Sequence, residues 1–289
     1  MNYEGNIIRP PSEAGSIILQ VTVGCSHNRC TFCGAYKGER FRIKDTAVIS
    51  ADIAFAARYC KKQKRVFLAD GDALIIPTAR LVEIFGAVRQ NLPWVNRISL
   101  YGNAKSILRK TTAELQQLKT LGLDRIYMGL ESGHDSVLKS IKKGVTAAQM
   151  TEAAAKIHAA GLFLSVTVLI GIGGRDMSLE HATETGQVLS RMKPNQIAAL
   201  TLMLLENTPL YHDARTGAFH LPDRTMLLAE LYKLVENIHL DRGQFQANHA
   251  SNYLPISGRL PRDKAVILRQ IEDGLNGMFP LKAECLRAL

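Results

Sequence analysis

Short, nearly continuous apolar runs alternate with helical patterns along the first two thirds of the chain. The runs are rich in β-branched residues, which is typical of strands buried on both faces of a parallel sheet. They lie at residues 16–23, 65–70, 97–101, 124–130, 162–171 and 196–203. Apolar residues spaced three and four apart predict helices between them, at residues 46–63, 78–91, 111–121, 146–160 and 178–191.

Six successive strand-helix units predict an α/β fold with right-handed crossovers. Such units form either a doubly wound sheet or a barrel-like sheet. In both, ligands bind at the carboxyl ends of the strands. We therefore read the residues directly after each predicted strand as candidates for a functional site.

The pattern changes after the sixth unit. A helix is expected from about Leu221, followed by an irregular polar loop over 243–264 and a last helix to about Gly274. No Gly/Ser linker or short repeat divides the chain. We expect an N-terminal segment at 1–15, one main domain at 16–210 and a C-terminal extension at 211–289 that covers the mouth of the sheet.

Composition narrows the class of protein. The 289 residues are 46% hydrophobic and carry a formal net charge of +10, which favours acidic partners such as nucleic acid, phosphorylated metabolites or carboxylates. The first residues lack the pattern of a secretory leader, and no apolar run approaches the length of a membrane span. A cytosolic protein without membrane contact is expected.

Three of the five cysteines are concentrated after the first predicted strand. Cys25, Cys30 and Cys33 have the spacing C-x4-C-x2-C, which suits reduced thiols that bind a metal. His27 lies inside the loop and would complete a structural Cys3His zinc site. Alternatively, the three thiolates hold a [4Fe-4S] cluster and leave one iron open to a small molecule.

The cysteine loop resembles that of the radical S-adenosylmethionine (SAM) superfamily. Members bind a [4Fe-4S] cluster through three cysteines after the first strand of a partial (β/α)6 TIM-like barrel, commonly with the spacing C-x3-C-x2-C. Phe32 matches the aromatic residue that usually precedes the last cysteine. The first gap here is one residue longer. The resemblance implies two cofactors, the cluster and SAM, and a fold of a partial barrel with a C-terminal helical extension.

Further motifs follow in order at the later strand ends, so that the resemblance runs from about Leu19 to Leu210. "LADGDALIIP" is similar to the family's "GGE" element, and "MGLESGHDSVLKSIKKG" resembles the branch that contains coproporphyrinogen dehydrogenase, the Elongator catalytic subunit and the methylthiotransferases. "VTVLIGIGG" and "ALTLMLLENTPLY" are similar to the fifth- and sixth-strand motifs. The cofactor contacts that the resemblance implies are Gly71 and Asp72 for the methionine amino group, Glu131 and Ser132 for the ribose or substrate, and Ile170, Gly171, Leu202 and Met203 for the adenine.

Four other polar residues are candidates for the functional site, and each also has an ordinary structural interpretation. Asn103 could bind the SAM carboxylate or stabilise a turn, and Arg175 could meet a carboxylate or remain solvated. The candidate catalytic residues are Glu131, His249 and Tyr253. His249 and Tyr253, in the loop "NHASNY", could orient a substrate or relay a proton. The alternative is that this loop satisfies its own backbone.

The resulting hypothesis is a radical SAM enzyme of anaerobic metabolism. A one-electron donor such as flavodoxin or ferredoxin would reduce the cluster, and a 5′-deoxyadenosyl radical would abstract hydrogen from a substrate. The substrate would be a small metabolite, a cofactor or a tetrapyrrole-like molecule, and the basic charge of the chain favours an acidic one. The alternatives are an RNA-modifying radical SAM enzyme, a TIM-like enzyme with structural zinc, and a nucleic-acid-binding protein whose metal site is structural.

Overall fold

The computed structural model describes residues 1–288, which divide into two compact units. The first comprises residues 1–28, 35–128 and 155–164, and the second comprises residues 29–34, 129–154 and the chain from Ser165 on. The chain therefore crosses between the units inside the cysteine motif, inside β6 (Leu123–Glu131), inside α6 (Ala147–Ala159) and inside β7 (Phe163–Ile170). The division into 1–15, 16–210 and 211–289 remains a prediction.

The first unit is built on parallel strands. β1 (Ile17–Gln20) pairs with β4 (Arg65–Ala69), β4 pairs with β5 (Arg97–Tyr101), and β5 pairs with the first residues of β6. Each pairing is in register through buried residues, for example Ile17 with Val66 and Val66 with Ile98. The short strands β2 (Thr22–Val23) and β3 (Arg42–Ile43) form a separate antiparallel pair.

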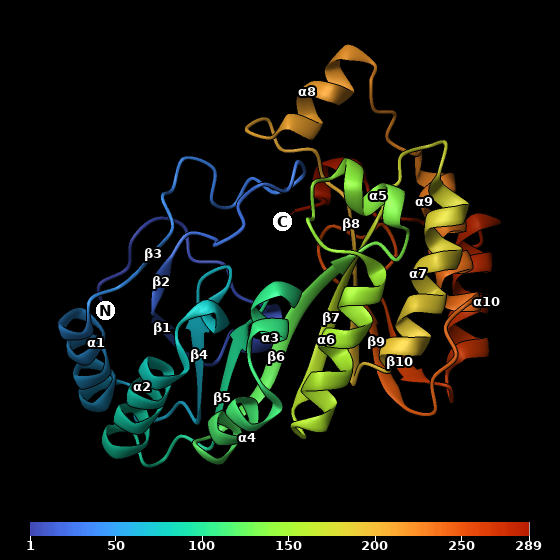
Figure 1. Ribbon diagram of the computed structural model, residues 1–289. Helices are drawn as coiled ribbons and strands as arrows, with labels where there is room; N and C mark the ends of the chain where they lie inside the picture. The colour runs from blue at the N-terminus through green and yellow to red at the C-terminus, as the bar shows by residue number, and fades with distance from the viewer. Residues whose placement is uncertain (289) are drawn as a thin grey trace. The chain divides into compact units, whose positions relative to one another are not determined.

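Helices cover the strands of the first unit on their outer side (Figure 1). They are α1 (Thr46–Tyr59), α2 (Thr78–Asn91), α3 (Ala104–Arg109) and α4 (Thr112–Thr120), with one-turn 3-10 helices at Pro11–Glu13 and Ala73–Ile75. α4 begins with a reciprocal capping box between Thr111 and Glu114. Val66, Phe67, Leu68 and Ala69 of β4 are fully buried, and burial of each larger side chain contributes about 2 kcal/mol.

The second unit continues the same plan and then departs from it. The later residues of β7 pair in parallel with β8 (Gln196–Thr201), and β8 pairs in parallel with β9 (Gly243–Ala247). β9 then pairs antiparallel with β10 (Ile256–Leu260). The helices are α5 (Asp135–Ser140), α6, α7 (Ser178–Met192), α8 (Pro209–Thr216), α9 (Arg224–Glu236) and α10 (Lys264–Leu275), with a 3-10 turn at Glu284–Leu286; α7, α9 and α10 pack side by side (Figure 1).

The predicted α/β class with parallel strands and crossover helices is confirmed, and the five predicted helices lie within a few residues of the observed α1, α2, α4, α6 and α7. The prediction of an irregular loop over 243–264 is wrong, because β9 and β10 form a hairpin there. Only Phe245, Ala247, Ile256 and Leu260 of these strands are buried apolar residues, so polar neighbours such as Gln244 and Gln246 hid the strand pattern. Within residues 1–288, no helix has both the length and the apolar character needed to cross a membrane.

Candidate active site

A buried aspartate joins three strand ends of the first unit. Asp72 follows β4 and accepts hydrogen bonds from the hydroxyls of Ser26 and Ser106, each at 2.6 Å. It also accepts two from Asn103, one from the backbone N–H at 3.1 Å and one from the side-chain Nδ2 at 2.7 Å. Ser26 adjoins Cys25, and Asn103 follows β5 and caps α3, so one carboxylate ties the cysteine motif to two strand ends.

The environment of Asp72 makes it an anchor. Its side chain has no exposed surface, and burial raises the pKa of the carboxyl while the hydrogen bonds from Ser106, Ser26 and Asn103 lower it. Four donors occupy the acceptor positions of a carboxylate. The geometry therefore places the predicted contact residue Asp72 inside the cluster, where it positions Ser26 and Asn103, and leaves the partly exposed Asn103 nearer the surface.

Gly71 is required by the close approach of the cysteine motif. A Cβ on Gly71 would lie 2.9 Å from the Cβ of Cys25, 3.3 Å from its Cα and 2.8 Å from Cε2 of Tyr36. Contacts below about 3 Å between carbon atoms are repulsive. The first cysteine of the motif thus packs directly on the carboxyl end of β4, and the predicted role of Gly71 in cofactor binding remains a prediction.

Asp70 is a second buried carboxylate, which sequence reasoning missed. One oxygen accepts from Nε2 of Gln20 at 2.8 Å, the other lies 3.5 Å from the hydroxyl of Tyr36, and the backbone N–H of Asp70 donates to Thr22 at 3.3 Å. Burial raises the pKa of Asp70 to about 6, although the hydrogen bonds from Gln20, from the Gly24 N–H and from Tyr36 and the charge of Lys44 each lower it.

We expect the stability contributed by Asp70 to fall as pH rises. Its folded-state pKa of about 6 exceeds the ordinary value of 3.8, so the contribution is complete below pH 3.8 and is lost through pH 6. Relative to the non-titrating variant Asp70→Asn, the wild type should lose on the order of 2 kcal/mol of unfolding free energy between pH 4 and pH 8. Urea unfolding of both proteins across this range measures the change, and a difference independent of pH would contradict it.

The four-residue gap between the first two cysteines contains a left-handed residue. Asn28 has φ of 38°, and its side-chain Nδ2 donates to the carbonyl of Tyr36 at 2.8 Å. The Nζ of Lys37 donates to the carbonyl of Asn28 at 3.3 Å. Asn tolerates this conformation better than other residues with a side chain. The longer gap is therefore accommodated at Asn28, which is fastened to the turn at 36–39.

Substitutions of Asn28 should separate the effect of its left-handed backbone conformation from that of the hydrogen bond of its side-chain amide. Asn28→Gly keeps the left-handed conformation and loses one hydrogen bond, at a cost of about 1 kcal/mol. Asn28→Val adds the strain of a β-branched residue there, for a total of about 2–3 kcal/mol. Urea unfolding measures both, and an equal loss for the two variants would show that the left-handed conformation is unimportant.

The second unit contains the other two cysteines of the motif, Cys30 and Cys33. They lie in a short loop that is held at both ends. The N–H of Thr31 donates to the carbonyl of Ile141 at 3.0 Å, and its carbonyl accepts from the N–H of Leu210 at 3.0 Å. Asn207 donates to the carbonyl of Gly34 at 2.9 Å. Cys30, Phe32 and Cys33 are partly exposed. Backbone bonds therefore fix this loop while its predicted ligand side chains keep access to the surface.

Glu131, at the end of β6, combines backbone strain with an ion pair. Its φ is 64°, a conformation that costs a residue with a side chain about 1–3 kcal/mol and that is concentrated at functional sites. One carboxylate oxygen lies 2.9 Å from Nζ of Lys143. Both groups lie over Gly129, where an added Cβ would be 2.1 Å from that oxygen. This carboxylate is the strongest candidate among the predicted catalytic residues.

The remaining predicted cofactor residues of the second unit differ in exposure. Ser132, Ile170 and Gly171 are buried, and the N–H of buried Leu202 donates to the carbonyl of Ile170 at 2.8 Å, which joins two of the predicted adenine positions. Met203 is partly exposed. Arg175 has an exposed side chain, and only its backbone is fixed, through an N–H bond to His220 at 2.8 Å.

Side chains of the NHASNY loop form hydrogen bonds to other parts of the second unit. Asn252 accepts from Thr201 at 2.7 Å and donates to the carbonyl of Ala199 at 2.8 Å, which ties the loop to the end of β8. The hydroxyl of Tyr253 bonds to Glu284 and to Arg287, whose guanidinium lies 4.3 Å from the ring centre. His249 bonds to Ser251 at 2.9 Å, and burial lowers its pKa. The structure therefore shows bonds within the second unit for His249 and Tyr253, and the catalytic roles predicted for these two residues remain predictions.

Arg287 was not predicted. Its side chain is buried and donates to the carbonyls of Ser251 at 2.6 Å and Leu202 at 2.9 Å. It thereby links the C-terminal segment to the NHASNY loop and to one of the predicted adenine residues. An isolated arginine near a chain end carries no local sequence signal for such a role.

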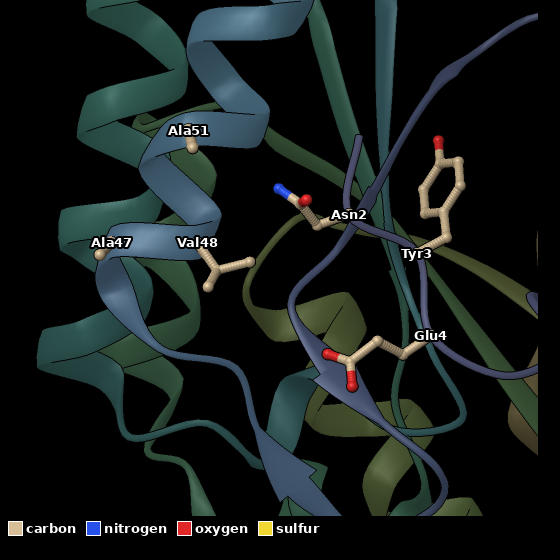
Figure 2. Close-up of a pocket in the computed structure, with 6 residues that line it drawn as sticks. All are labelled: Asn2, Tyr3, Glu4, Ala47, Val48 and Ala51. Carbon is tan, nitrogen blue, oxygen red and sulfur yellow. The ribbon is translucent and has the colours of Figure 1, made fainter.

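A cavity of about 540 Å³ lies elsewhere in the first unit, between the N-terminal segment and α1. It is lined by Asn2, Tyr3, Glu4, Ala47, Val48 and Ala51, and Figure 2 shows Asn2 pointing toward the helix that carries Ala51 while Tyr3 points away. Its polar groups are already bonded, Asn2 to Asp52 and Glu4 to Arg42 and Gln20. The residues at the strand ends, among them the buried carboxylates of Asp70 and Asp72 in the first unit, remain the better candidates.

Comparison with known proteins now decides the family. The family model described as the radical SAM superfamily matches residues 19–186, which is more than half of the chain. The chain belongs to the radical SAM superfamily. The predicted superfamily, its enzymatic character and its two cofactors, a [4Fe-4S] cluster and SAM, are thereby confirmed at the level of the family.

One curated relative is similar in sequence. The 4'-phospho-dehydrooxetanocin synthase of Priestia megaterium is 26% identical over 208 residues, which cover 65% of this chain and 28% of the relative. The chain thus spans just over a quarter of the length of that relative.

Solved radical SAM structures share the fold. A TsrM methyltransferase from Kitasatospora setae matches with a TM-score of 0.57 at 18% identity, over 70% of this chain and 39% of that protein. Coproporphyrinogen III oxidase from Escherichia coli matches with a TM-score of 0.57 at 13% identity, over 76% and 51% of the two chains. Methylornithine synthase matches with a TM-score of 0.54 at 14% identity, over 88% and 68%. The predicted fold class is consistent with these barrel-type proteins.

Within residues 1–288, no group of three or more His, Cys, Asp or Glu side chains has an arrangement that could hold a metal ion. The ligand roles of Cys25, Cys30 and Cys33 remain predictions, carried by their spacing and by the family.

Proposed function

We propose that this radical SAM enzyme cleaves SAM reductively and uses the resulting 5′-deoxyadenosyl radical to abstract hydrogen from a substrate that is still to be identified. The observation that supports this most directly is the C-x4-C-x2-C motif, whose first cysteine packs on Gly71 at the end of β4. Cys25, Cys30 and Cys33 would hold the cluster. When bound, the cluster supplies the electron that breaks the S–C5′ bond of SAM.

The protein residues then have three tasks. Asp72 holds Ser26 and Asn103 beside the first cysteine, and Asn103 would receive the carboxylate of the methionine moiety. Glu131 has a strained, left-handed backbone conformation, and Lys143 binds its carboxylate. This carboxylate would accept hydrogen bonds from the ribose hydroxyls. Ile170, Gly171, Leu202 and Met203 would enclose the adenine. The apolar side chains of Ile170, Leu202 and Met203 would also exclude water from the radical.

The test is reconstitution of the full chain with iron and sulfide under anaerobic conditions. We expect roughly four iron and four sulfide per chain, and 5′-deoxyadenosine and methionine once dithionite and SAM are added. Bound zinc without iron or sulfide would overturn the proposal in favour of a structural Cys3His site with His27. A full cluster without any 5′-deoxyadenosine would indicate a structural cluster.

The charge of the chain supports an acidic substrate. The formal net charge is +10, and the curated relative is named for a phosphorylated product. We therefore place phosphorylated small molecules ahead of RNA as candidate substrates. Substrate-dependent consumption of SAM, measured with phosphorylated and dephosphorylated forms of each candidate, tests this order. The same charge suits an acidic electron donor such as flavodoxin or ferredoxin, in place of dithionite.

A further inference from the structure

A network of buried polar side chains in the second unit joins two of the strand ends just described. Its members are Ser132 after β6, His181 of α7 and Glu230 of α9. The hydroxyl of Ser132 lies 2.8 Å from Nδ1 of His181, and Nε2 of His181 lies 3.4 Å from Oε1 of Glu230. All three side chains are at most 1% exposed. His181 and Glu230 lie among the buried, mostly apolar residues by which α7 and α9 pack on each other. Polar groups buried there need hydrogen-bond partners.

The hydrogen bonds around His181 are compatible with Nδ1 as an acceptor. The N–H of His134 donates to the hydroxyl oxygen of Ser132 at 3.0 Å, so the serine proton is available for Nδ1 of His181. The neighbouring Thr185 donates its proton to the carbonyl of His181 at 2.5 Å and accepts from the N–H of Gly133 at 2.8 Å. Nδ1 can accept the serine proton, and the hydroxyl of Thr185 lies 3.3 Å from the same nitrogen. With Nδ1 as the acceptor, the proton of a neutral ring is on Nε2, the nitrogen that lies 3.4 Å from Glu230.

Glu230 connects this network to the turn after β7. Oε1 accepts from the N–H of Gly171 at 2.5 Å, and Oε2 accepts from the hydroxyl of Ser178 at 2.5 Å. Gly171 has φ of 89°, a conformation that favours glycine, so its N–H is presented by a turn rather than by the strand. A fully buried carboxylate requires such donors, and removal of its charge would leave the Gly171 turn less firmly held.

This network of side chains therefore ends at two places that the proposed function assigns to the adenosine half of SAM. Ser132 adjoins Glu131, the proposed ribose ligand, and Gly171 is a proposed adenine contact. We propose that His181 and Glu230 are positioning residues that couple these two strand ends and pre-organise them for the adenosine moiety. They act through Ser132 and Gly171 and do not themselves touch SAM. This inference rests on the proposed function.

The test compares two matched substitutions on one helix in the reconstituted, unreduced holoprotein. Glu230→Gln removes the buried carboxylate, while Glu236→Gln changes an exposed glutamate at the end of α9 that pairs with Lys233. Equilibrium dialysis gives the Kd for SAM and for L-methionine, which lacks the adenosine half. We expect the Kd for SAM to rise about tenfold or more in Glu230→Gln. The Kd for methionine, the iron content and both constants of Glu236→Gln should stay at wild-type values.

A second readout needs no ligand. Amide hydrogen exchange in peptides that contain Gly171 should accelerate in Glu230→Gln and stay unchanged in Glu236→Gln. If Glu230→Gln does not fold, His181→Asn serves instead, because its amide can still accept from Ser132 while it no longer reaches Glu230. Equal weakening of SAM and methionine together with loss of iron would show a general structural role and overturn the inference.

The two proposals fail in different ways. A wild-type protein that holds the cluster but neither binds SAM nor forms 5′-deoxyadenosine overturns the proposed function, and the inference with it. A wild-type protein that does both, with SAM affinity and Gly171 exchange unchanged in Glu230→Gln, overturns the inference alone.

Discussion

Replacement of Cys30 or Cys33 by serine should reduce 5′-deoxyadenosine formation to background. A serine hydroxyl is a poor ligand for iron at neutral pH, and a three-cysteine site has no spare protein ligand. Both residues lie in a loop fixed by backbone bonds of Thr31 and Gly34, so the substitutions should leave the fold unchanged. Iron and sulfide analysis, together with quantification of 5′-deoxyadenosine after anaerobic reconstitution, measures the effect.

The chain supplies two matched controls for this experiment. Cys60 is the C-terminal cap of α1, and Cys285 is exposed in the last 3-10 turn, so neither belongs to the motif. Cys60→Ser and Cys285→Ser should retain wild-type iron, sulfide and product. A Cys30→Ser variant with a full cluster and undiminished product would refute the ligand assignment.

Replacement of Asp72 by alanine should cause the largest loss of stability among the strand-end residues. It leaves the hydroxyls of Ser26 and Ser106 and two N–H groups of Asn103 without the acceptor that the buried Asp72 carboxylate supplies. Loss of one partner from such a buried, charged cluster costs about 3–5 kcal/mol. Urea unfolding of the protein without its cluster measures the loss. Asp72→Asn, which retains one carbonyl oxygen, should lose less.

The control for Asp72 is a surface aspartate of the same unit. Asp124 is about half exposed and lies 3.9 Å from Arg97, so Asp124→Ala should change stability by no more than about 0.5 kcal/mol. Because Ser26 adjoins Cys25, Asp72→Ala should also bind less iron on reconstitution. An unchanged urea midpoint in Asp72→Ala would show that its donors find other acceptors, and the anchoring role would be lost.

Local pattern was sufficient for most regular elements of the first two thirds of the chain. α2 was predicted at 78–91 and is observed at Thr78–Asn91, because apolar residues at helical spacing pack Leu81, Ile84 and Phe85 into the core. The elements that were missed are short or mostly polar. β3 has two residues, and the β9–β10 hairpin is stabilised by strand pairing that its own composition does not indicate.

The candidate site was predicted only in part. Gly71, Asp72 and Asn103 followed from the rule that ligands gather at the carboxyl ends of parallel strands, and the structure joins Asp72 to Asn103. The roles of Asp70, His181, Glu230 and Arg287 were missed. Their partners lie far away in the sequence: Gly171 is 59 residues from Glu230, and Leu202 is 85 residues from Arg287.

The sequence by itself determined the superfamily and its cofactors, and it predicted the three cluster ligands, because the cysteine spacing and the ordered strand-end motifs are local patterns. It also raised the question of the longer first gap. Only the tertiary structure showed that Asn28 accommodates that gap in a left-handed conformation, and that Asp72 is an enclosed anchor rather than a surface ligand. Both are decided by burial and hydrogen-bond geometry, which depend on residues that folding brings together from distant parts of the chain.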